Sequence, residues 1–198
     1  VQGFMKVPFS AKKLGADMIS ISGHKIHAPK GIGALYIKTG VKIKPLIRGG
    51  AQESGMRAGT EAMPQIAAFG EACRIAKENL AENAAKMAAL RQLTIDTLTP
   101  AIPELQVING AAPHILSISL PGWRSEVLMN FLEAENIYVS RSSACKKGGR
   151  SHVLEAMPLP AQVIDGAIRI SFSRYSTEDD VLALCSALKR AHDTLAHR

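Results

Sequence analysis

The chain has 198 residues, of which 46% are hydrophobic and 21% charged, so it can bury a core as one large domain or two small ones. No apolar run approaches the roughly 18 residues that a membrane span needs, and no signal peptide is visible, so we expect a cytoplasmic protein without a membrane partner. The formal charge of +7 is spread along the chain and aromatic residues make up only 5%, so we expect no nucleic-acid partner.

The first half of the chain predicts two strands, a loop and a helix. Short apolar runs at 18–22 and 33–37 predict buried strands joined by a turn. From 48 to 60 the sequence is rich in glycine and polar residues, which predicts a loop. Alanine-rich helical periodicity from Met63 to about Thr97 predicts one long helix, straight or kinked, which Pro100 and Pro103 should end.

The second half predicts a compact α+β unit, with strands at 115–120, 137–139 and 168–172, a short helix at 126–135 and a final helix. Thr177 is expected to cap that last helix, because acidic residues follow it in the first turn. We therefore expect an α/β portion over 1–65, a connecting helix over 66–99 and a small α+β domain over 100–198. The chain begins at Val1 without an initiator methionine, so we expect a fragment of a longer protein.

Lys25 is the first candidate for chemistry. It follows the predicted strand at 18–22 within the tetrapeptide Ser22-Gly23-His24-Lys25. Burial at the end of a strand disfavours the charged form of a lysine, and the neutral amine is the form that attacks an aldehyde to make a Schiff base. An ordinary surface loop after a strand explains the same four residues equally well.

The three cysteines have no short spacing, which argues against a disulfide framework and against a zinc site. Cys73 and Cys185 lie in helical hydrophobic patterns and are predicted to be core residues. Cys145 is different, because a cationic and polar setting favours the thiolate. Its neighbours are Ser142, Ser143, Lys146, Lys147, Gly148 and Gly149. Without further context, an ordinary cysteine on a surface loop is the alternative.

A series of motifs then points to one family. The motifs are Ser22-Gly23-His24-Lys25, Gly49-Gly50-Ala51-Gln52-Glu53, Arg57-Ala58-Gly59-Thr60-Glu61, Ser142-Ser143-Ala144-Cys145, Ser151-His152-Val153-Leu154-Glu155-Ala156-Met157 and Ile168-Arg169-Ile170-Ser171-Phe172-Ser173. Their order and spacing resemble the class V aminotransferases, and more narrowly the cysteine desulfurases of the NifS and IscS type. The resemblance implies an α/β fold, namely the C-terminal half of a transferase of fold type I that depends on pyridoxal 5'-phosphate (PLP). It would hold a remnant of the large-domain sheet, a long connecting helix and a small α+β domain.

The resemblance also implies roles for residues of the first half. Lys25 matches the lysine that holds PLP as a Schiff base and then moves the substrate's Cα proton. Ser22 and His24 match residues that hydrogen-bond the cofactor phosphate. Thr60 matches a phosphate contact donated across a dimer interface, which implies a homodimer. Gln2 matches a glutamine that hydrogen-bonds the phenolic oxygen of the cofactor.

In the second half, Arg169 matches the arginine that clamps the substrate carboxylate, with a surface ion pair on a strand as the alternative. Cys145 matches the nucleophile that takes sulfur from L-cysteine, forms a persulfide and releases L-alanine. No metal site is expected, because His24 and His27 lack a third ligand. Relative to the family about half of the enzyme is missing, so we expect the fragment alone to bind PLP weakly or not at all and to be inactive.

Three functions stay open at this point. The first is a cysteine desulfurase that passes sulfur to an acceptor protein, for example in iron–sulfur cluster assembly. The second keeps the fold and the cofactor but changes the substrate, as in selenocysteine lyase or another class V aminotransferase. The third is a non-catalytic interaction module. Cys145 favours the first, because relatives with other substrates can lack a cysteine in that loop.

Overall fold

The computed structural model describes residues 1–108, 110–141 and 150–195, and it divides into two compact units, Val1–Ala81 and Glu82–Arg198. Cys145 and its neighbours Lys146 and Lys147 therefore lie outside the described residues. Within the described residues, no helix combines the length and apolar character needed to cross a membrane.

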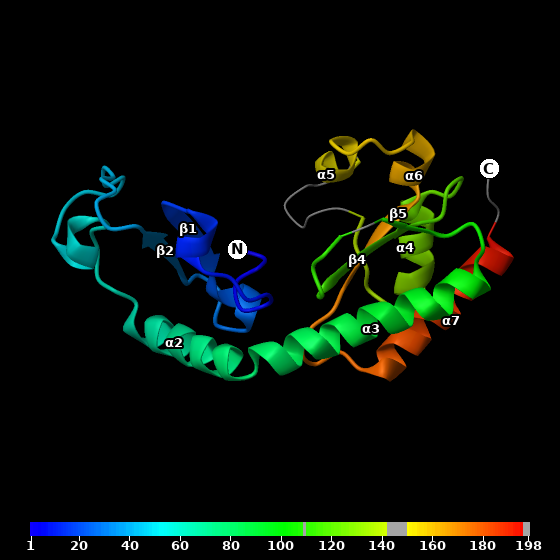
Figure 1. Cartoon of the computed structure of the whole chain (residues 1–198), viewed down its shortest axis with the longest axis horizontal. Coiled ribbons are helices and arrows are strands. Elements are labelled where there is room, and N and C mark those ends of the chain that lie inside the picture. Colours follow the sequence, from blue (N-terminus) through cyan, green and yellow to red (C-terminus); the bar gives the residue numbers. More distant parts are fainter. Residues whose placement is uncertain (109, 142–149, 196–198) are drawn as a thin grey trace. The chain divides into compact units, whose positions relative to one another are not determined.

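The first unit is built around one hairpin and one helix (Figure 1). Strands β1 and β2 pair antiparallel, with Ser22 opposite Gly33, and helix α2 follows after an irregular stretch. The elements are α1 (Ala11–Leu14), β1 (Met18–Ser22), the 3-10 helix η1 (Gly23–Ile26), β2 (Gly33–Ile37), the 3-10 helix η2 (Gln52–Gly55) and α2 (Met63–Glu78). Both predicted strands are confirmed in position.

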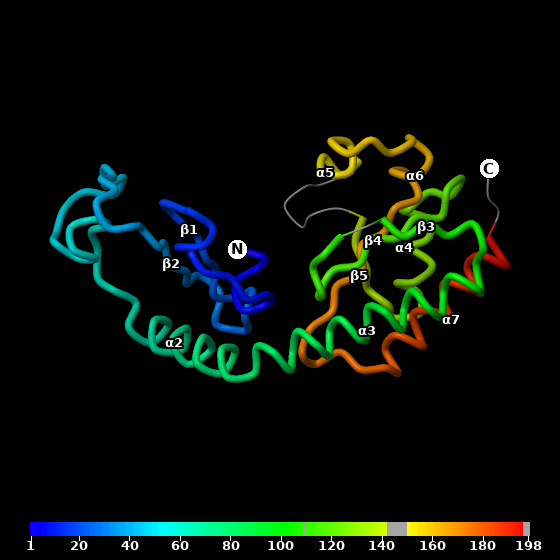
Figure 2. The backbone as a smooth tube through the Cα atoms, in the orientation of Figure 1, coloured from blue at the N-terminus to red at the C-terminus, as the bar shows by residue number. Residues whose placement is uncertain are grey.

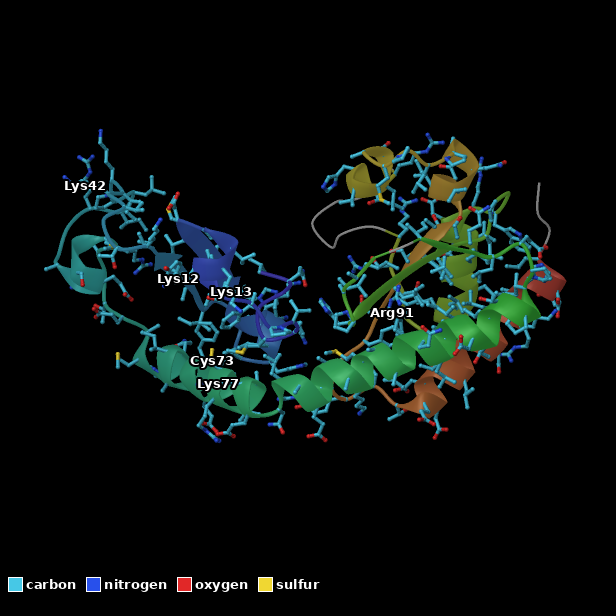
Figure 3. The ribbon with its side chains drawn as sticks, viewed as in Figure 1. Lys12, Lys13, Lys42, Cys73, Lys77 and Arg91 are labelled. Atoms are coloured by element: carbon cyan, nitrogen blue, oxygen red, sulfur yellow. The ribbon has the colours of Figure 1, made fainter. Side chains whose placement is uncertain are left out.

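The burial predicted for these strands is wrong. Leu35 is 50% exposed and Tyr36 43%, and along β2 only Ile37 is even half-buried. The physical reason is that β1 and β2 bond only to each other among the described residues, so both are edge strands, and of their side chains only Ile21 packs against the buried cluster of this unit. The core of this unit lies instead under the turn, where Ile26, Ala28 and Phe69 are buried. Cys73 of α2, labelled in Figure 3, packs against that cluster as predicted.

The second unit is a three-stranded antiparallel sheet in the order β3-β4-β5, with three longer helices that share its core. Its elements are α3 (Leu80–Ala101), β3 (Gln106–Ile108), β4 (Ile115–Ser119), α4 (Ser125–Ala134), α5 (His152–Glu155), α6 (Ala161–Asp165), β5 (Ala167–Ser171) and α7 (Glu178–Thr194). Helices α3 and α7 run side by side in Figures 1 and 2. Leu98, Leu128 and Leu188, one from each long helix, are fully enclosed in the shared core.

Strand alternation divides the sheet into two faces. Ile168 and Ile170 of β5 belong to the core shared with the helices, whereas Ala167 belongs to a smaller cluster with Val163 and Leu154. Because successive side chains of a strand point to opposite faces, Arg169 shares the face of Ala167, away from the long helices. The fold therefore places Arg169 on the side of the sheet where α6 packs.

Three local predictions need correction. The predicted long helix is two helices, α2 and α3, which are separated at Asn79. Pro100 does not stop α3 directly but lies one residue inside its end. No strand forms at 137–139; the nearest pairing is an isolated bridge between Ser140 and Arg169. The cap at Thr177 is confirmed, since its side chain accepts from the Asp180 N–H and Asp180 accepts from the Thr177 N–H.

Candidate functional site

The turn after β1 positions the first group of predicted site residues. Gly23 is buried there, and a Cβ on it would lie 2.8 Å from Ile32 Cγ2 and 3.0 Å from the Ile32 carbonyl oxygen. Its N–H donates to that same carbonyl at 2.9 Å. Only glycine fits so close an approach, so the chain turns tightly against the start of β2. Ile26, 2% exposed, then anchors the end of the turn in the core.

This turn carries Ser22, His24 and Lys25 within four consecutive residues, and the first two are in contact. A hydrogen bond of 2.9 Å joins Ser22 Oγ and His24 Nδ1, and the tautomer of the imidazole decides which of the two donates. Ser22 and Lys25 are half-buried and His24 is exposed. A hydroxyl, an imidazole and an amine thus lie within four residues, at the end of a strand.

These groups fit a phosphorylated aldehyde such as PLP. Hydroxyl and imidazole groups can donate hydrogen bonds to phosphate oxygens, and a primary amine is the group that condenses with an aldehyde. The close approach at Gly23 keeps the turn narrow, so the three side chains project from a fixed backbone. Within the described residues, no group of three potential metal ligands occurs.

Gln2 and Thr60 belong to the same unit but are not joined to this turn. Both are exposed, and no hydrogen bond in the described part of the chain links either to Ser22, His24 or Lys25. Thr60 follows a loop in which the Gly59 N–H donates to Gln52 Oε1 at 3.2 Å. Their roles toward a cofactor stay predictions.

Arg169 lies in the second unit, in the middle of β5, opposite Ser117 of β4. Its backbone also bonds to Ser140, whose N–H donates to the Arg169 carbonyl at 3.1 Å. The side chain is half-buried, and its buried Nε has no hydrogen-bond partner in the described residues. A buried, unsatisfied guanidinium N–H is costly, so this arginine is suited to a planar anionic partner such as a carboxylate.

The residues on either side of the undescribed stretch 142–149 are held by ion pairs. Arg141 pairs with Glu126 at the start of α4, and Arg150 pairs with Asp165 at the end of α6 through bonds of 2.6 and 2.7 Å. The hydrogen bond from Arg150 lowers the pKa of Asp165, with a smaller contribution from the charge of Arg124.

Sequence reasoning missed the surroundings of these pairs. They line an open cavity of about 330 Å³ in the second unit. Its lining residues come from separate segments, namely Arg124, Ser125, Glu126, Arg141, Arg150, Ser151, Ile164 and Asp165. Of the lining residues only Ser151 belongs to one of the motifs, and the sequence could not indicate the cavity because its walls come from segments far apart along the chain.

The comparison with protein families agrees with the motif pattern. Residues 1–184 match the family described as aminotransferase class-V. The chain belongs to this family. Class-V aminotransferases generally depend on PLP, which fits the donors on the turn after β1.

Relatives within the family are cysteine desulfurases. The chain is 41% identical over 186 residues to cysteine desulfurase 2 of Trichormus variabilis, across 91% of this chain and 46% of that protein. It is 40% identical over 187 residues to cysteine desulfurase IscS of Methanosarcina thermophila, with the same shares covered. A solved NifS-like protein superimposes with a TM-score of 0.88 and 39% identity over 98% of this chain and 51% of that one. The chain thus has the fold of one half of a NifS-like enzyme and spans about half the length of the curated relatives it matches.

Proposed function

We propose that this chain is part of a PLP-dependent cysteine desulfurase, which converts L-cysteine to L-alanine and transfers the sulfur to Cys145. The observation that carries the proposal is the turn after β1, where the hydrogen-bonded pair Ser22 and His24 is followed directly in the chain by Lys25. The names of the relatives support the substrate, because both curated relatives reported above are cysteine desulfurases.

Residues of the first unit would hold the cofactor. Ser22, His24 and Thr60 would bind its phosphate, Gln2 would donate to its phenolic oxygen, and the Lys25 amine would hold its aldehyde carbon. When bound, PLP supplies an electron sink for bonds at the Cα of the substrate. The Lys25 amine would take and return the Cα proton of the substrate.

Residues of the second unit would bind and cleave the substrate. The Arg169 guanidinium, with its unsatisfied buried Nε, would orient the carboxylate of L-cysteine. The Cys145 thiolate would attack the substrate sulfur, so that an S–S bond forms as the C–S bond breaks. The electron pair of the C–S bond stays with the carbon, which gains a proton to become alanine, and the persulfide on Cys145 passes its outer sulfur to an acceptor protein.

We also propose a homodimer, because the role of Thr60 is a contact donated to the other copy. The exposure of Thr60 and of the β1–β2 hairpin supports it, since both offer surface to a partner. Sedimentation of the protein should give twice the monomer mass, and a monomer that retains full activity would contradict this part of the proposal.

The activity is tested by incubation with L-cysteine, PLP and dithiothreitol, with alanine and sulfide both quantified. The dithiol reduces the persulfide, so that its outer sulfur leaves as sulfide and the dithiol becomes a disulfide. Because the chain spans about half the length of its relatives, the assay is run on the 198 residues and on the protein in the full length in which it is encoded. We expect equal amounts of alanine and sulfide from the longer form, and background from the 198 residues alone.

Two substitutions in the longer form test the residue roles. Lys25→Ala should abolish the visible absorbance of the lysine Schiff base, whereas Lys30→Ala, an exposed lysine just after the same turn, should keep it. Cys145→Ala should stop sulfur transfer, whereas Cys73→Ala, which alters a core cysteine, should not. Full activity in Cys145→Ala would exclude the persulfide role. Turnover of L-selenocysteine with none of L-cysteine would favour selenocysteine lyase instead.

A further inference from the structure

The cavity beside α4 has a charge balance that leaves one arginine without an ion pair. Of the charged groups that line it, Glu126 is paired with Arg141 and Asp165 with Arg150. Among the described residues, Arg124 has no carboxylate within ion-pair distance, although its charge contributes to the lowered pKa of Asp165. Among the described lining residues, three guanidiniums against two carboxylates give a formal charge of +1.

The start of α4 adds unsatisfied donors to the same cavity. Arg124 is the N-cap of this ten-residue helix and its side chain makes no capping hydrogen bond. The N–H of Val127 and that of Leu128 already bond to the Arg124 carbonyl. The first two N–H groups of a helix have no partner within it, and here no acceptor in the described residues takes those of Ser125 and Glu126. The positive end of the helix dipole thus opens on the cavity.

The Ser125 side chain is an independent sign of a missing partner. Ser125 is only 6% exposed and lines the cavity, yet its hydroxyl makes no hydrogen bond within the described part of the chain. Ser125 lines the cavity together with Arg124, so its hydroxyl can donate a hydrogen bond to a ligand atom there without first giving up a partner among the described residues.

We propose that this cavity binds a small carboxylate. The guanidinium of Arg124, the N–H groups of Ser125 and Glu126 and the Ser125 hydroxyl would all donate to its two oxygens. A carboxylate matches the site better than a dianion such as sulfate, because the lining charge of +1 balances a single negative charge. The carboxylates of Glu126 and Asp165 also line the cavity, each paired with an arginine, and they would repel a second negative charge on the ligand. The cavity is separate from Arg169, which does not line it.

The test is a titration of the 198-residue chain with sodium acetate, followed by the amide NMR signals of Ser125 and Glu126, with chloride holding the ionic strength constant. We expect saturable shifts of these two amides. Arg124→Gln should weaken acetate binding about tenfold, as expected for loss of one charge-assisted hydrogen bond. Ser125→Ala, which keeps the charge, should weaken it severalfold. Arg174→Gln is the matched control, because it removes an exposed arginine that stacks on Tyr175 outside the cavity.

Several outcomes would overturn the proposal. Acetate shifts that do not saturate, or that are equal in the parent chain and in Arg124→Gln, would show that the cavity is not a carboxylate site. Tighter binding of sulfate than of acetate would refute the charge argument. If Arg124→Gln loses its circular dichroism spectrum, the comparison of Ser125→Ala with the parent decides, and unchanged acetate affinity in that variant refutes the proposal. Since the readout is binding alone, failure of the desulfurase assay leaves this result intact.

Discussion

Replacing Gly166 with alanine should destabilise the second unit through a steric clash. Gly166 joins α6 to β5, and its φ of −86° is open to any residue, so the backbone conformation does not demand glycine. Glycine is needed because there is no room for a side chain: a Cβ at position 166 would lie 2.1 Å from the Leu120 carbonyl oxygen and 3.0 Å from Ser119 Oγ. That carbonyl would have to move about 1.3 Å to reach the 3.4 Å of ordinary contact.

The neighbours of Gly166 cannot easily make that room. Leu120 is 1% exposed, and its N–H donates to the Gly166 carbonyl at 3.3 Å. Ser119 is held by a hydrogen bond of 2.6 Å from its hydroxyl to the Val163 carbonyl. Overpacking of a rigid core costs about 1–3 kcal/mol, and we expect the upper part of that range because the clash is with backbone. Against a total stability of about 5–15 kcal/mol this is a large loss.

Urea unfolding measures the effect. Trp123, the single tryptophan, lies beside the clash, since its backbone N–H donates to the Leu120 carbonyl at 3.1 Å. Its fluorescence should report a midpoint lowered by roughly 1 M in Gly166→Ala, with m of about 1–3 kcal/mol/M unchanged. Gly110→Ala is the control, because nothing lies within 4 Å of a Cβ there. Equal midpoints for the two variants would refute the steric argument.

Three further predictions concern the same unit. Leu128→Ala opens a cavity at a fully buried residue and should lower the free energy of unfolding, measured in urea, by about 2–5 kcal/mol. Val127 is 40% exposed, so Val127→Ala should lower it far less, and equal losses in the two variants would contradict the packing. Thr177→Ala should lower the free energy of unfolding by about 1 kcal/mol through loss of the capping box, and no change would mean that the cap is not formed. Hydrogen bonds that the His192 imidazolium donates to Glu104 and, with a smaller effect, to Asp193 raise the pKa of His192. Its contribution to stability is therefore complete below about pH 6.5 and is lost as the pH rises through the folded pKa. The rings of His192 and Trp123 stack with their centroids 5.9 Å apart, so tryptophan fluorescence should follow this titration. A free energy of unfolding that stays constant or rises as the pH increases through the folded pKa would contradict the prediction. So would a free energy of unfolding equal to that of His192→Gln at every pH.

Local sequence signals were sufficient for much of this protein. Apolar runs located β1, β2, β4 and β5, because a strand needs only a short stretch of suitable side chains. The cap at Thr177 follows from residues three positions apart, whose bonds close within one turn of helix. The turn at Ser22 to Lys25 is equally local, and the motifs that follow it identified the family before the structure was known.

Other features depend on contacts between distant segments. The burial expected of β1 and β2 needs a covering layer, which a strand pattern cannot reveal, and among the described residues only Ile21 of β1 packs against the buried cluster of that unit. The need for glycine at position 166 comes from Leu120, 46 positions earlier in the chain. The unsatisfied Nε of Arg169 likewise depends on what β4 and the backbone at Ser140 place around it.

The sequence by itself determined the family, most of the strands and helices and the group Ser22, His24 and Lys25, because each is encoded by neighbours along the chain. Only the tertiary structure decided that Arg124 and Ser125 line a cavity together with Arg141 and Arg150. It also decided that, among the described residues, two carboxylates pair with Arg141 and Arg150 and none pairs with Arg124. The physical reason is that charge balance and enclosure are properties of a volume. Residues from several segments must fold around that volume before either property exists.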